Sequence, residues 1–95
     1  MHPVVVVQSD TFNQSDFKTV VVCELTETLD LGKARGNVEV VPGEANLKMQ
    51  SVVNVSQIFT VDKRDLKEWI GKLDSDRVRE ILDGLRLLLE GESDY

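Results

Sequence analysis

Runs of valine near the start of the chain predict two buried β-strands. Residues 3–8 hold four consecutive valines after Pro3, and residues 18–25 form a second apolar run. β-branched side chains favour extended backbone, and runs without polar interruption are typical of buried strands. The stretch 9–16 between them is polar and rich in turn formers, so we expect the two strands to lie side by side.

Three shorter strands are expected further along the chain. Residues 36–41 alternate, with Val38 and Val40 on one face, and a Pro-Gly turn follows them. Residues 51–55 and 59–62 are also rich in β-branched and aromatic side chains, with a polar break between them. This spacing predicts two separate strands there.

The segment after these strands fits more than one pattern. Residues 62–65 are expected to form a turn or one turn of helix. Within residues 66–73, Leu66 and Ile70 have helical spacing, whereas alternate positions from Trp69 onward fit one face of a strand. We predict a strand for 66–73.

The last element predicted is an amphipathic helix. Its apolar residues follow i, i+3, i+4, i+7 spacing: Val78, Ile81, Leu82, Leu85, Leu88 and Leu89. Asp74 or Ser75 can cap its start, Asp76 suits the first turn, and Gly91 ends it. A helix so rich in leucine has to pack on the sheet or on another subunit.

Strands first and a helix last give an α+β fold that is mainly β. The 95 residues suffice for one domain, expected over 1–91, with a frayed tail at 92–95. Because the apolar strands stop in hydroxyl and amide residues, the pattern indicates a barrel with a polar site at its rim.

The charge balance argues against a protein that coats nucleic acid. The net charge is −6, whereas proteins that coat nucleic acid are usually basic. An enzyme that takes one short strand into a local pocket stays possible. Lys18, Lys33, Arg35 and Lys48 would then form a small basic patch, unless they are simply solvated surface.

The single cysteine and the start of the chain limit the disulfides, the metal sites and the cellular location that can be expected. Cys23 is the only cysteine, so the chain has no intrachain disulfide and no cysteine zinc set, and we expect Cys23 to pack as a small apolar side chain. The valine run is too short for a membrane span and lacks the basic start of a signal peptide. We therefore expect a cytoplasmic protein that does not enter membranes.

The residue types favour chemistry without a metal or cofactor. His2 is the only histidine, no carboxylates cluster at helical spacing, and there is no glycine-rich phosphate loop. RNA carries its own nucleophile, the 2′-hydroxyl, and its cleavage needs only alignment, proton removal and stabilisation of the phosphorane. Thr26, at a strand end, suits the stabilising role; alternatively, it caps a turn.

Several blocks of sequence carry a family resemblance. They are residues 2–10 with Asn13, 19–26, 36–38, 51–57, 60–63, 70–71 and 84–87. In order and spacing they resemble the MazF/PemK family of toxin endoribonucleases from bacterial toxin–antitoxin pairs. The resemblance implies a small SH3-like barrel (the fold of CcdB, MazF and PemK) with a C-terminal helix, acting as a homodimer.

The resemblance also implies an activity and partners. The activity is sequence-selective cleavage of single-stranded RNA, usually mRNA, without metal or cofactor, leaving a 2′,3′-cyclic phosphate and a 5′-hydroxyl. The implied partner is an antitoxin whose C-terminal segment occupies the RNA groove. The implied setting is the bacterial cytoplasm.

Two family positions carry the catalysis. Thr26 matches the family threonine, but His2 stands where the family has arginine. Family members also begin with a further strand and a glycine-rich loop ahead of that arginine. Three explanations stay open: a shortened start that cripples the enzyme, a natural inactive form that still binds antitoxin, or His2 acting as a general base.

The remaining candidate residues are expected to contact RNA. They are Gln8, Ser9, Lys33, Arg35, Asn54, Ser56 and Gln57. Alternatively, Asn54, Ser56 and Gln57 have a structural role and form hydrogen bonds to backbone groups at the strand break. The chain is thus expected to be a toxin-like endoribonuclease; the alternative is an inactive binding module of the same fold that pairs with an antitoxin or another protein.

Overall fold

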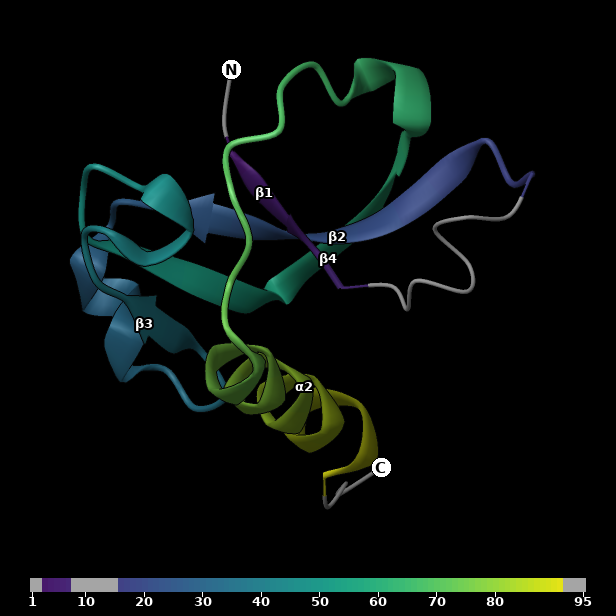
Figure 1. Cartoon of the computed structure of the whole chain (residues 1–95). Coiled ribbons are helices and arrows are strands. Elements are labelled where there is room, and N and C mark those ends of the chain that lie inside the picture. Colours follow the sequence, from purple (N-terminus) through teal and green to yellow (C-terminus); the bar gives the residue numbers. More distant parts are fainter. Residues whose placement is uncertain (1–2, 8–15, 92–95) are drawn as a thin grey trace.

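The computed structural model describes residues 3–7 and 16–91, and it forms a curled antiparallel sheet with one C-terminal helix (Figure 1). The described strands are β1 (Val4–Val6), β2 (Thr19–Thr26), β3 (Val38–Val40) and β4 (Ser51–Asp62), in the order β1-β2-β4-β3. The described helices are the short 3-10 turns η1 (Leu29–Lys33), η2 (Glu44–Asn46) and η3 (Lys63–Asp65), and the α-helix α2 (Ser75–Glu90). The predicted α+β class, mainly β, is confirmed, and the sheet is a half-barrel.

The two valine runs pair as predicted. β1 lies antiparallel to β2, with Val4 opposite Glu24 and Val6 opposite Val22. Most of the polar connector between them falls outside the described residues. β2 is central in the sheet, because its other edge pairs with β4 over its whole length.

One long strand replaces the two that were predicted over residues 51–62. Cys23 and Glu24 are adjacent in β2, yet they pair with Ile58 and Asn54 of β4, so residues 55–57 have no partner in β2. The polar break is therefore a bulge inside β4. A bulge absorbs unpaired residues while the ladder continues on either side, and it increases the local twist.

The predicted strand at 66–73 is wrong. These residues are irregular and run past β1 towards α2 (Figure 1). The segment is held near its middle instead, where Asn46 Nδ2 donates a 3.0 Å hydrogen bond to the Ile70 oxygen. Alternation reports one covered face, but a strand also needs backbone pairing with a neighbouring strand, and none of the described strands pairs with this segment.

The helix packs on the sheet through a narrow part of its apolar stripe. Ile81 and Leu85 are buried in the core with valines of β3 and β4, whereas the other four residues of the predicted stripe stay exposed. Gly84 allows the close approach, because a Cβ there would collide with the Gly36 carbonyl oxygen. The predicted caps are confirmed: the Asp74 carboxylate accepts from the Arg77 nitrogen at 2.8 Å, and Gly91 ends the helix.

Candidate active site

Thr26 lies at the end of β2, opposite Val52 of β4, and is half-buried. Its Oγ1 accepts a 3.1 Å hydrogen bond from the Thr28 nitrogen, so Thr26 does cap the turn that leaves the strand. A hydroxyl that accepts a hydrogen bond keeps its own hydrogen. The turn therefore orients Oγ1 and leaves it able to donate to a ligand.

The bulge decides which side chains share a face with Thr26. Glu24 precedes Thr26 by two residues and so points to the same side of the sheet. Asn54 stands opposite Glu24, and its Nδ2 lies 3.4 Å from Glu24 Oε1. Since Thr26 faces Val52, Asn54 is its diagonal neighbour, about 7–8 Å away along such a ladder.

Ser56 completes this group from the bulge. Its hydroxyl donates a 2.8 Å hydrogen bond to Asn54 Oδ1, and Asn54 is only 7% exposed. Both ends of the Asn54 amide are thus engaged, and its orientation is fixed. We call Glu24, Thr26, Asn54 and Ser56 the polar strip.

Sequence reasoning missed Glu24. It lies inside an apolar run that was interpreted as a wholly buried strand. The available signal was a single carboxylate in that run, two residues before Thr26. In the structure Glu24 is half-buried and takes part in none of the ion pairs of the described residues.

Sequence reasoning also missed Asn37, which ties the bulge to the loop after Thr26. Its Oδ1 accepts a 3.0 Å hydrogen bond from the Val55 nitrogen, and its Nδ2 donates a 2.9 Å bond to the Leu31 oxygen. Val55 belongs to the unpaired part of β4, and Leu31 to η1. One amide therefore ties the bulge of β4 to η1. The available signal was an asparagine directly after a glycine, and Gly36 has a φ of 89° in the structure.

The predicted RNA-contacting residues are only partly gathered. Gln57 is exposed in the unpaired part of β4, while Lys33 and Arg35 are exposed at and after the end of η1. His2, Gln8 and Ser9 lie outside the described residues. Their roles, including that of His2 in place of arginine, stay predictions.

Lys18 does not join the expected basic patch of Lys18, Lys33, Arg35 and Lys48. Lys18 precedes β2, whereas Lys33 and Arg35 follow it. The two ends of an eight-residue strand are about 24 Å apart, at about 3.4 Å per residue. Lys18 therefore cannot share a patch with cations at the Thr26 end of β2.

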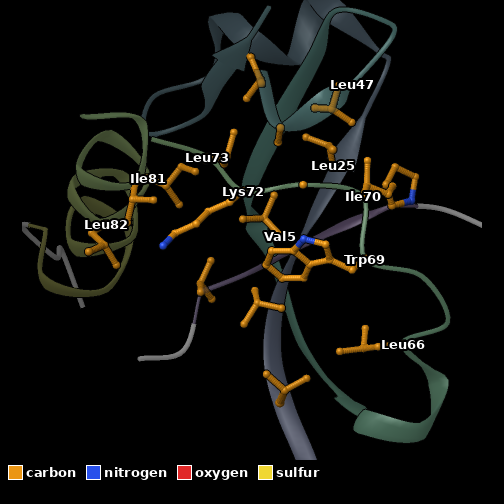
Figure 2. A pocket seen from close by; sticks show the side chains of 18 of the residues that line it. Val5, Leu25, Leu47, Leu66, Trp69, Ile70, Lys72, Leu73, Ile81 and Leu82 are labelled. Atoms are coloured by element: carbon orange, nitrogen blue, oxygen red, sulfur yellow. The ribbon is translucent and has the colours of Figure 1, made fainter. Parts of the chain in front are cut away.

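An apolar groove lies beside the sheet, and none of the four residues of the polar strip lines it. It has a volume of about 660 Å³ and runs between β1, residues 66–73 and α2 (Figure 2). Leu25 lines it, so its neighbours Glu24 and Thr26 point away from it. Trp69 lies over the groove beside Val5 and is 77% exposed (Figure 2). The groove offers apolar contact and none of the polar strip.

Neither a metal cluster nor a reactive thiol is found among the described residues. No three His, Cys, Asp or Glu side chains among them are grouped as a metal site requires, and no helix among them is long and apolar enough to cross a membrane. Cys23 is fully buried, as predicted, and burial raises the pKa of its thiol. A buried neutral thiol is a poor nucleophile, which leaves the polar strip as the candidate site.

Comparisons with known proteins agree with this fold. The chain is similar to endoribonuclease MazF2 of Mycobacterium bovis and to endoribonuclease MazF6 of Mycobacterium tuberculosis, at 36% identity over 88 residues in each case. These matches cover 93% of this chain and 77% of each relative.

Solved structures share the architecture. The Mycobacterium tuberculosis toxin MazF-mt6 matches with a TM-score of 0.83 at 20% identity, covering 97% of this chain and 89% of that one. An endoribonuclease in complex with its cognate antitoxin, from a mycobacterial species, matches with a TM-score of 0.82 at 22% identity, covering 97% and 84%. At these identities the likeness speaks for the fold.

The family follows from the sequence comparison. The model of the PemK-like, MazF-like toxins of type II toxin–antitoxin systems matches residues 1–89, which is nearly the whole chain. The half-barrel, its C-terminal helix and the threonine at the end of β2 are all consistent with this match. The chain belongs to the PemK-like, MazF-like family of type II toxins.

Proposed function

We propose that the chain is a toxin endoribonuclease of the bacterial cytoplasm that cleaves single-stranded RNA without a metal ion. The observation that carries the proposal is the polar strip. It places an oriented hydroxyl, Thr26, diagonally across from a fixed amide, Asn54, at the open end of β2. Relatives with 36% identity bear the name endoribonuclease, which supports the same activity here.

The chemistry uses the 2′-hydroxyl of the RNA as nucleophile. The Thr26 hydroxyl donates to a non-bridging phosphate oxygen, where negative charge grows as the phosphorane forms. Preorganised donors aimed at developing charge are among the strongest catalytic effects available without a metal. Lys33, Arg35 and Gln57 contact the RNA on either side of the phosphate that is cleaved. The products carry a 2′,3′-cyclic phosphate and a 5′-hydroxyl.

A matched pair of substitutions at Thr26 tests the activity. The chain is incubated with a long unstructured RNA in EDTA, and the ends of the products are identified. Thr26→Val keeps the shape of the side chain but removes the hydroxyl, so kcat should fall about 10²-fold or more. Thr26→Ser keeps the hydroxyl and should retain most of the activity. Cleavage that is equal in all three proteins refutes the role of Thr26, and no cleavage by the unsubstituted chain refutes the function.

The second candidate function is binding of an antitoxin without catalysis. In this case the chain binds the antitoxin either as a homodimer or as a single chain. The exposed Trp69 over the apolar groove favours it, since large apolar surfaces often mark docking sites. Trp69 is the only tryptophan, so its fluorescence reports on the groove. Titration with a purified antitoxin should shift that emission, and sedimentation equilibrium measures the oligomeric state. Tight binding with no RNA cleavage would select this candidate over the first.

A further inference from the structure

We propose that Glu24 is the general base of the reaction, the group that takes the proton from the attacking 2′-hydroxyl. The inference rests on the function proposed above and assigns the step that Thr26 cannot perform. Glu24 and Thr26 lie on one strand and one face. Their Cα atoms are about 7 Å apart along a strand, a span that one phosphodiester and its neighbouring 2′-hydroxyl can bridge.

The Glu24 carboxylate is held in place on one side only. Asn54 Nδ2 lies 3.4 Å from Oε1, and Asn54 is itself fixed by the Ser56 hydroxyl. The second oxygen, Oε2, has no hydrogen-bond partner among the described residues. The carboxylate is therefore oriented through Oε1, while Oε2 can come within hydrogen-bond reach of a substrate hydroxyl, as a general base must.

Glu24 has little structural reason to be where it is. Glutamate is disfavoured in strands, and this one sits in the middle of the sheet between β1 and β4. β1 presents Val4 opposite it and β4 presents Asn54, neither of which titrates. The next carboxylate on the same face of the described sheet is Glu39 of β3. Glu39 pairs with Val52 of β4, and Val52 separates it from Thr26 of β2. Among the described residues Glu24 thus has no cationic partner, and it lies beside the oriented hydroxyl of Thr26.

The step balances without any further reactant. Glu24 Oε2 takes the proton of the 2′-hydroxyl, and that oxygen forms a new bond to phosphorus. The bond from phosphorus to the 5′-oxygen breaks, and the leaving oxygen takes a proton from water. The hydroxide left behind removes the proton from Glu24. The net change is transfer of the phosphoryl linkage to the 2′-oxygen.

Two variants at Glu24 and one matched control test the assignment. Glu24→Gln keeps the size and the acceptor for Asn54 but cannot take a proton, so kcat should fall about 10²-fold or more. Glu24→Asp should keep part of the activity. Glu27→Gln changes an exposed carboxylate just beyond Thr26 and should leave kcat unchanged. Affinity for an RNA with a 2′-deoxy sugar at the mapped cleavage site should be the same in all four proteins.

The pH dependence of the rate distinguishes a general base from a structural residue, because replacing a structural residue would not change the shape of the pH profile. The kcat/KM of the unsubstituted chain should rise with pH at its acid end, and this limb should be missing in Glu24→Gln. An active chain without an acid limb, or a Glu24→Gln variant as fast as the parent, overturns the role of Glu24 and leaves the ribonuclease function standing. If the parent chain cleaves no RNA, the proposed function fails, and the role of Glu24 fails with it.

Discussion

Replacement of Asn37 by alanine is the most direct test of how the bulge in β4 is held. The change removes two hydrogen bonds, one from the Val55 nitrogen and one to the Leu31 oxygen, both part-buried. Val55 is 1% exposed, and its nitrogen has no partner in β2 because it belongs to the unpaired residues of the bulge. The substitution therefore leaves a backbone donor without a partner in the core.

The size of the effect follows from these two losses. A buried donor left unpaired costs about 1–3 kcal/mol, and an ordinary hydrogen bond contributes about 1 kcal/mol. The Leu31 oxygen is closer to the surface and can bind water instead. We expect Asn37→Ala to lower the free energy of unfolding by about 2–3 kcal/mol, a large part of the roughly 5–15 kcal/mol of a typical domain.

Urea unfolding and amide hydrogen exchange measure this prediction. With an m-value of about 1–3 kcal/mol per molar urea, the midpoint should fall by about 1 M or more. The Val55 amide should exchange much faster in Asn37→Ala. Gln57→Ala is the control, because it changes an exposed side chain of the same bulge and should shift stability by no more than about 0.5 kcal/mol. A loss below about 0.5 kcal/mol in Asn37→Ala, with Val55 still protected, would refute the reasoning.

Two further predictions concern how α2 is attached. Gly84→Ala forces a Cβ into the Gly36 carbonyl oxygen, so it should destabilise the protein by about 1–3 kcal/mol although alanine has the better helix propensity. The control Asp83→Ala changes an exposed residue of the same helix and should be near neutral. Equal urea midpoints for the two variants would contradict the close approach of α2 to Gly36. Glu44 binds the Arg77 guanidinium through both carboxylate oxygens, at 2.9 and 3.0 Å, and these hydrogen bonds lower the pKa of Glu44 below its ordinary value of 4.5. Because the folded-state pKa is depressed, the stabilisation is present above about pH 4.5 and is lost as the pH falls through the folded-state pKa. The urea midpoint of Glu44→Gln should thus lie below that of the parent at pH 7 and approach it near pH 3; a constant difference across this range would count against the ion pair.

Local patterns predicted the elements that depend on local physics. The valine runs gave β1 and β2, because β-branched side chains restrict the backbone wherever they stand. The spacing from Val78 onward gave α2, and Asp74 and Gly91 marked its ends because capping is settled within one turn. The position of Thr26 at a strand end was visible for the same reason.

Pairing between distant residues was decided only in the tertiary structure. The bulge joins residues 51–62 into one strand because β2 continues alongside both halves, and residues 66–73 remain irregular because no described strand pairs with them. Glu24 and Asn54 are 30 residues apart in the sequence, and only the register of β2 against β4 brings them together. Sequence periodicity reports which face of an element is covered, whereas the partner of each strand depends on the loops, bulges and competing edges of the whole chain. The sequence by itself thus identified β1, β2, α2 and the position of Thr26 at a strand end. Which residues lie beside Thr26 was decided only by the tertiary structure, through the register of β2 against β4.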